Sequence, residues 1–103
     1  MEEKKTIILD LTGCETWGEL HKRIRVAFDF PEWYGENWDA FWDLLRSECD
    51  ADEVVIKGEN TLNNQIYTEI KTMYNMLDMN VSEHEKYRKL YADVKPFTYR
   101  IED

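Results

Sequence analysis

The chain has 103 residues, of which 43% are hydrophobic and 14% aromatic, enough for one domain with a sizeable core and too few for two. Its 22 acidic and 13 basic residues give a formal net charge of −9. A phosphate backbone repels such a chain, so direct binding to nucleic acid is not expected. We expect a single folded domain over residues 1–103, since this hydrophobic content argues against disorder.

The N-terminal residues and the two cysteines indicate the cellular compartment in which the protein is expected. The first five residues, M-E-E-K-K, precede only three consecutive apolar residues, which is the pattern of neither a signal peptide nor a membrane span. Cys14 and Cys49 are too few for a secreted disulfide framework and lack metal-ligand spacing. We therefore expect a cytoplasmic protein, monomeric when free, that does not associate with membranes and needs no metal or other cofactor.

Local patterns predict the elements of the first half of the chain. Thr6 to Leu11 reads as a strand, and Thr16 to Glu19 has the form of a capping box that begins a helix reaching Phe28. Pro31 then prevents simple continuation and opens a loop. Asn37 is a suitable N-cap for the next helix. The apolar stripe of that helix is predicted to be Trp38, Phe41, Trp42 and Leu45.

The second half contains two further strand patterns, Glu53 to Lys57 and Phe97 to Ile101. A helix is expected between them from about Leu62 to Leu77. Ser82 to Glu85 repeats the capping-box pattern and predicts an extra helix that Pro96 stops. Three strands separated by helices predict an α/β fold, with a small three-stranded parallel sheet packed with helices and the extra helix before the last strand.

Acidic residues are concentrated in the middle of the chain. The stretch from Asp29 to Glu53 contains one basic residue, Arg46, and nine acidic residues, so it holds −8 of the net −9. The nine are Asp29, Glu32, Glu36, Asp39, Asp43, Glu48, Asp50, Asp52 and Glu53. A patch of one sign steers partners of the opposite sign. On composition alone, however, a solvated helix face with flanking loops accounts for the same pattern.

Two of these acids occupy one face of the predicted helix. Asp39 and Asp43 are four residues apart and point away from the apolar stripe. They repel each other mildly, so they do not stabilise the isolated helix. An acid in the first turn favours the helix dipole, which explains Asp39 without any partner, and Asp43 fits an ordinary exposed face. These physical grounds alone do not require a functional role for either.

The segment Pro31 to Leu45, P-E-W-Y-G-E-N-W-D-A-F-W-D-L-L, resembles the signature of the barstar family. In that signature an aromatic-Tyr-Gly-x-Asn loop leads into a helix beginning x-Asp-Ala-x-Trp-Asp. The matching positions are Trp33, Tyr34, Gly35, Asn37, Asp39, Ala40, Trp42 and Asp43. The resemblance extends upstream through Leu20-His21 and covers about the first 58 residues, whereas the remainder matches only in the order of its elements.

The resemblance implies an immunity protein, an intracellular inhibitor of a small, basic, barnase-like, guanyl-type ribonuclease that the cell exports. It implies that Asp43 occupies the enzyme's phosphate position and that Asp39 pairs with a second cation. The partner-binding residues would be Trp33, Tyr34, Gly35, Asn37, Asp39, Trp42 and Asp43. Trp33 would be an aromatic anchor, and Gly35 would permit close approach of the backbone.

Several of these residues have structural alternatives. Asn37 fits a helix cap better than a contact, Tyr34 fits packing beneath the loop equally well, and Trp42 fits half-buried support for Asp43. The family also uses an acid on a later helix, for which Glu69 and Asp78 both remain candidates. The segment Asp78 to Lys95 is longer than its counterpart in the familiar inhibitors, and its role stays open.

Two other functions compete with inhibition. The same fold and acidic face would suit a binding module for a different basic protein. Paired carboxylates can also perform acid–base or metal chemistry. The sequence nevertheless contains no phosphate-binding loop or nucleophile elbow, and His21, beside an apolar stripe, fits a structural histidine. An enzyme is therefore the weaker alternative, and we expect a protein that inhibits an enzyme without being one.

Overall fold

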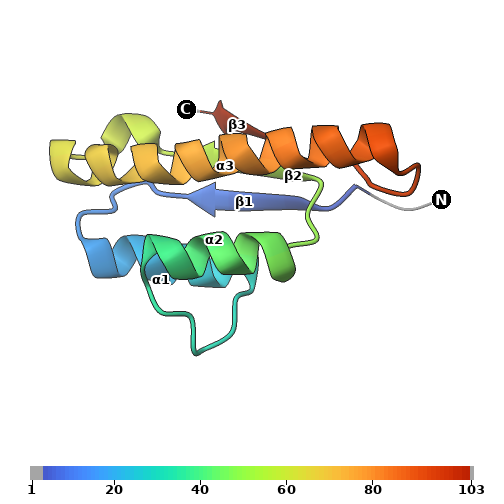
Figure 1. Cartoon of the computed structure of the whole chain (residues 1–103). Coiled ribbons are helices and arrows are strands. Elements are labelled where there is room, and N and C mark those ends of the chain that lie inside the picture. Colours follow the sequence, from blue (N-terminus) through green and yellow to red (C-terminus); the bar gives the residue numbers. More distant parts are fainter. Residues whose placement is uncertain (1–3, 103) are drawn as a thin grey trace.

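The computed structural model describes residues 4–102. The elements in chain order are β1 (Thr6–Asp10), α1 (Trp17–Phe28), α2 (Trp38–Ser47), β2 (Glu53–Lys57), the 3-10 helix η1 (Glu59–Thr61), α3 (Asn64–Leu90) and β3 (Thr98–Glu102) (Figure 1). No end of a predicted strand lies more than one residue from the observed end, and β2 matches at both ends. Phe97, expected to begin the last strand, is instead buried just before it.

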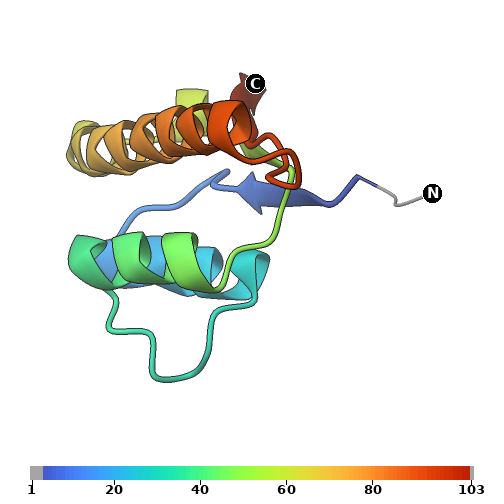
Figure 2. The same cartoon turned by 45° about the vertical axis from the view of Figure 1, so that its right-hand side comes forward.

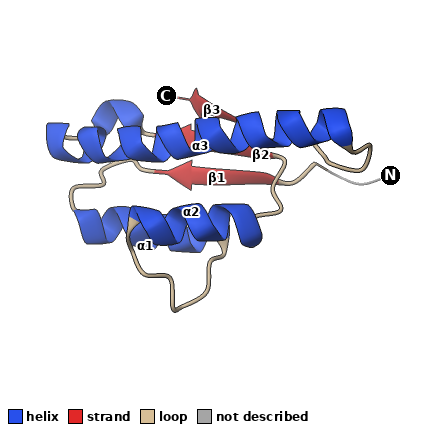
Figure 3. Cartoon of the chain, viewed as in Figure 1, coloured by secondary structure: helices blue, strands red, loops and turns tan. Residues whose placement is uncertain are grey.

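The three strands form one parallel sheet in the order β1-β2-β3. The α/β fold expected from the sequence is therefore confirmed. Alternate side chains of the first two strands enter one core together with residues of all three helices; these side chains are Ile7, Leu9, Val54 and Ile56. Helices thus cover one face of the sheet: α1 packs on β1, α2 packs on α3, and α3 contacts Tyr99 of β3 through Tyr74 and Asp78 (Figure 3).

The opposite face of the sheet carries charged side chains. Arg100 of β3 forms ion pairs with Glu53 and Glu102, and Lys57 pairs with Glu102 at 3.5 Å. Val55 at the centre of this face is nevertheless buried. Because long charged side chains cover apolar surface with their stems, Val55 is buried without a second layer of helices, whereas Ile8 of β1 on the same face is 55% exposed.

The second half of the chain contains one long helix where two were expected. α3 runs without a break from Asn64 to Leu90, so the additional helix predicted from the Ser82–Glu85 pattern is its C-terminal part. No Gly or Pro interrupts this segment, and Asn80 is buried in mid-helix. A capping box begins a helix only where the preceding residues are not already helical, and here they are.

The last turns of α3 are exposed. Every residue from Glu85 to Asp93 is on the surface, including the large side chains of Tyr87, Leu90 and Tyr91. A helix of 27 residues is about 40 Å long, whereas a strand of five spans about 17 Å. The short sheet therefore offers these turns little surface on which to pack.

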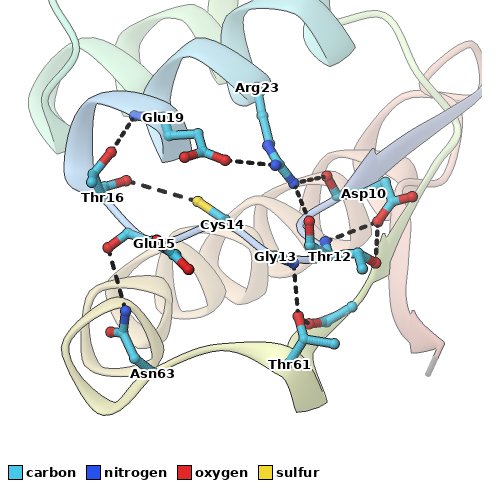
Figure 4. A network of polar contacts seen from close by, with 11 residues as sticks. Asp10, Thr12, Gly13, Cys14, Glu15, Thr16, Glu19, Arg23, Thr61 and Asn63 are labelled. Atoms are coloured by element: carbon cyan, nitrogen blue, oxygen red, sulfur yellow. Dashed lines mark hydrogen bonds and ion pairs between the residues drawn. The ribbon is translucent and has the colours of Figure 1, made fainter.

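A network of polar contacts fixes the start of α1 relative to the sheet (Figure 4). Arg23 donates to the carbonyls of Asp10 and Thr12, at 3.1 and 2.8 Å, and to the Glu19 carboxylate at 2.6 Å. Thr61 and Asn63 join the other side of the network by bonds to Gly13 N and the Glu15 carbonyl; the distances are 3.1 and 3.3 Å. α1 is thereby fixed to the end of β1, and the segment before it is fixed to the residues that precede α3.

Candidate partner-binding site

The 29–37 loop projects from the layer formed by α1 and α2 (Figures 1 and 2). Trp33 lies on this loop with 73% of its surface exposed. Buried aromatic side chains flank it on both sides, Phe30 before and Tyr34 after, and Tyr34 N donates to the Pro31 carbonyl at 3.0 Å. The loop therefore presents one large exposed ring on a turn whose two sides are anchored in the core.

Tyr34 is the deeper of the two anchors, with only 5% of its surface exposed. Its hydroxyl shares a hydrogen bond with Nδ1 of His21, with 2.6 Å between the heavy atoms. Burial raises the pKa of Tyr34 and lowers the pKa of His21, so both groups are neutral near pH 7. Tyr34 thus packs beneath the loop, in agreement with its structural alternative. His21 is buried beside it, and its Nε2 has no hydrogen-bond partner among the described residues.

The buried His21 ring belongs to an aromatic cluster that joins α1, α2 and the loop. Its centroid lies 4.3 Å from that of Trp17 and 4.7 Å from that of Trp38. Trp17 Nε1 also donates to the carbonyl of Glu36 at 3.2 Å. Glu36 has a φ of 52°, a left-handed conformation that this bond helps to hold. The exit of the loop is therefore fixed as well as its middle.

Asn37 caps α2 as the sequence predicted. Its Oδ1 accepts from Ala40 N at 2.8 Å, and its Nδ2 donates to the Gly35 carbonyl at 3.1 Å. A Cβ on Gly35 would lie 3.1 Å from Asn37 Nδ2 and 3.4 Å from the Cβ of Ala40. Gly35 therefore also lets the loop pack tightly on the cap.

α2 is anchored by Phe41, Leu44 and Leu45, and Asp39 and Asp43 are exposed on its outer side. Leu44 was not in the predicted stripe, and Trp38 and Trp42 are only half-buried. Among residues 4–102, neither aspartate carboxylate has an ion-pair or hydrogen-bond partner. These two charges are thus available to a partner on a helix that the core holds rigid.

Trp42 packs against Arg46, which lies one turn further along α2. The Arg46 guanidinium carbon is 5.2 Å from the centroid of the Trp42 ring, and its Nε is 3.3 Å from Glu83 Oε2 of α3. The half-buried position of Trp42 fits the supporting role expected for it. Arg46, the single basic residue of the acidic stretch, is thereby paired with an acid from outside that stretch.

The two acids of α3 left open by the sequence point to different elements. Glu69 Oε2 accepts from Trp38 Nε1 of α2 at 3.3 Å. Asp78 Oδ1 accepts from the Tyr99 hydroxyl of β3 at 2.6 Å. Only Glu69 therefore lies beside the helix that carries Asp39 and Asp43.

A surface groove that the sequence did not indicate separates α2 from the C-terminal half of α3. Its volume is about 770 Å³. Its lining includes Asp43, Arg46, Glu83, His84, Tyr87 and Tyr91. Because these residues come together only through the packing of α3 on α2, no local sequence pattern could have revealed them. Asp43 therefore borders both the acidic face and this groove.

Three further features would indicate other classes of protein, namely a metal site, a membrane-spanning helix and a reactive cysteine. Within residues 4–102, no group of three or more His, Cys, Asp or Glu side chains is placed to hold a metal ion. The same part of the chain has no helix long and apolar enough to cross a bilayer. Both cysteines are free, and burial raises the pKa of both thiols, which disfavours the reactive thiolate. The prominent chemistry of the site is unpaired carboxylate beside exposed aromatic surface.

The fold and this site define a class of small α/β proteins that present an acidic helix and an aromatic loop. The family model of Barstar (barnase inhibitor) matches residues 4–95, and the chain therefore belongs to the barstar family. A protein of Bacillus subtilis (strain 168) named "Putative ribonuclease inhibitor YrdF" is 39% identical to it over 46 residues. These residues are 45% of this chain, and they span about half the length, 50%, of that curated relative.

Proposed function

We propose that this chain is a cytoplasmic inhibitor of a small, basic, guanyl-type ribonuclease, and that it blocks the active site of that enzyme. The observation that carries the proposal is the pair of exposed carboxylates, Asp39 and Asp43, without partners among the described residues and held on a helix packed into the core. Membership of the barstar family supports the same function.

The chemistry of a ribonuclease active site suits such a helix. The enzyme must stabilise a negatively charged phosphate, so its cleft presents Arg, Lys and His side chains. A carboxylate in the phosphate position accepts charge-assisted hydrogen bonds from the same groups. In this proposal Asp43 takes that position, and Asp39, one turn earlier, pairs with a second cation at the rim.

The 29–37 loop supplies the apolar part of the contact. Trp33 is the large exposed ring of the loop, and rigid aromatic side chains commonly dominate the energy of protein interfaces. Because Tyr34 and Glu36 already fix the loop, little conformational entropy is lost on binding. Gly35, Asn37 and Trp42 complete the proposed surface as supports of the loop and of Asp43.

The test is a titration of this protein against a panel of small guanyl-preferring ribonucleases. The panel includes barnase and any ribonuclease encoded beside this chain. We expect complete inhibition of at least one enzyme at a one-to-one ratio, and no ribonuclease activity from the chain itself. If every enzyme kept full activity in excess protein, the proposal would be wrong, and a pull-down with an Asp43→Ala control would then seek a different basic partner.

A further inference from the structure

The groove between α2 and α3 has no role in the proposal above, although it opens beside Asp43. Two exposed tyrosines from the end of α3 line it, Tyr87 with 43% and Tyr91 with 58% of its surface accessible. Their ring centroids lie 6.5 Å apart with an interplanar angle of 29°. The groove therefore combines an unpaired carboxylate on one wall with a stacked aromatic pair on the other.

We propose that this groove receives one Arg or Lys side chain of the ribonuclease, from a position next to the enzyme's active site. This inference rests on the proposed function and extends its contact surface from α2 and the 29–37 loop to the C-terminal turns of α3. The occupant is part of the same basic partner, because Asp43, which would occupy the enzyme's phosphate position, also lines the groove.

The charges of the groove favour a cation. Asp43 has no ion-pair partner within the described chain, whereas Arg46 is paired with Glu83 and rests on the Trp42 ring. The positive charge of Arg46 is thus largely compensated, and the uncompensated charge is that of Asp43. A cation beside Asp43 would also lie near the two tyrosine rings that line the groove. Such rings attract cations electrostatically, and Lys86 Nζ already lies 5.9 Å from the centroid of the Tyr87 ring.

The backbone that carries the aromatic wall is held by contacts within the chain. The backbone N of Tyr91 donates to the Tyr87 carbonyl at 2.7 Å. His84 Nδ1 donates to the Lys95 carbonyl at 3.0 Å and packs its ring 5.6 Å from that of the buried Phe97. These contacts tie the segment after α3 to the helix itself. A preformed wall of this kind reduces the entropy lost on association.

The experiment uses the ribonuclease of the panel that the unaltered chain inhibits most strongly, and it measures dissociation rates by surface plasmon resonance. The test variant carries Tyr87→Ala and Tyr91→Ala together. Its control is Tyr67→Ala, which removes a tyrosine of similar exposure, 40%, from the other end of α3. We expect the double variant to dissociate about ten to thirty times faster, and the control to stay within about twofold.

Two further variants identify the chemistry. Changing both tyrosines to Phe retains the rings, so we expect dissociation close to that of the unaltered chain. Tyr91→Lys places a positive charge in the groove at the end of a helix, where the helix dipole tolerates a cation. It should weaken binding more than the matched change Tyr67→Lys, and it keeps the test decisive should the double alanine variant fail to fold.

The outcomes separate the two proposals. If Asp43→Ala abolishes inhibition while both groove variants dissociate like the unaltered chain, the groove proposal is wrong and the proposed function stands. If the Phe variant dissociates as fast as the alanine variant, the hydroxyls rather than cation–ring contacts hold the partner, and the proposal is again wrong. If the unaltered chain inhibits no ribonuclease, both proposals fail.

Discussion

At the scale of single residues, a substitution of Asp43 should separate the effect on partner binding from the effect on folding most clearly. Its side chain is exposed and has no partner within residues 4–102, so Asp43→Ala should change the free energy of unfolding by less than about 0.5 kcal/mol. At the interface it would leave the enzyme's cations buried without a counter-charge. Removing one member of such a pair weakens binding by about 2–5 kcal/mol, or at least about thirtyfold, a scale to which measurements on this family itself contribute.

Melting temperatures and inhibition constants of three variants, measured in one buffer, check this prediction. Asp39→Ala should also weaken inhibition, and Glu48→Ala, at the C-cap of α2, should do so less. Equal and small losses for all three would remove Asp43 from the centre of the contact. A large fall in melting temperature for Asp43→Ala would instead reveal a structural residue.

Gly58 gives a converse prediction, in which stability changes and binding does not. It has a φ of 82°, and a Cβ there would lie only 2.4 Å from the backbone N of Thr12. Gly58→Ala should therefore destabilise the fold by about 2–4 kcal/mol through strain and collision. Gly13→Ala is the matched control, because its φ of 74° is similar but no atom of the described residues lies within 4 Å of the added Cβ.

Chemical denaturation of both glycine variants measures the difference. We expect Gly13→Ala to lose only about 1 kcal/mol, the part that comes from the left-handed backbone. The folded fraction of each should inhibit normally, since neither glycine lies at the proposed surface. Equal losses for the two variants would mean that the contact with Thr12 relaxes freely.

At the scale of the elements, the contact between His21 of α1 and Tyr34 of the loop predicts a pH dependence. Burial lowers the pKa of His21, and the nearby acids Glu36 and Glu69 oppose this only in part. The unfolded chain therefore binds a proton at higher pH than the folded one does. The contribution of His21 to the free energy of unfolding is therefore complete above about pH 6.5, the pKa of histidine in an unfolded chain. This contribution is lost as the pH falls below that value.

Unfolding free energies measured between pH 7.5 and 5 test this coupling. His21→Asn keeps a short polar group near the Tyr34 hydroxyl but cannot be protonated, so it should be less stable at pH 7.5 and show a flatter profile. Inhibition should weaken over the same range, because the loop carrying Trp33 depends on this contact. A variant with the same slope as the unaltered chain would assign the pH dependence to other groups.

The same elements show what the sequence could and could not predict. The caps at Thr16 and Asn37 were predictable because each bond joins residues three positions apart. The break expected at Ser82 was wrong, because α3 continues through this residue and the segment contains no Gly or Pro to end it. The His21–Tyr34 bond and the groove were likewise invisible, because each joins elements that only the tertiary structure brings together.

At the scale of the whole molecule, folding divides the acidic stretch into two groups. Asp50, Asp52 and Glu53 form ion pairs with basic residues near the amino ends of the strands. The other six acids form no ion pair within residues 4–102; they are Asp29, Glu32, Glu36, Asp39, Asp43 and Glu48. The uncompensated charge of this stretch is therefore concentrated on the loop and α2, where the proposed partner docks.

This concentration predicts association that is steered electrostatically. A stopped-flow series with the inhibited ribonuclease should show the association rate falling on the order of tenfold from 0.01 to 0.15 M salt, as the screening length shortens from about 30 to 8 Å. Dissociation should change far less, because close contacts set it. Glu32→Gln should slow association at low salt more than Asp50→Asn, which removes an equal charge already paired with Lys5. Equal effects of the two changes would show that net charge alone steers the partner, and an association rate independent of salt would exclude the loop and α2 as the surface that attracts it.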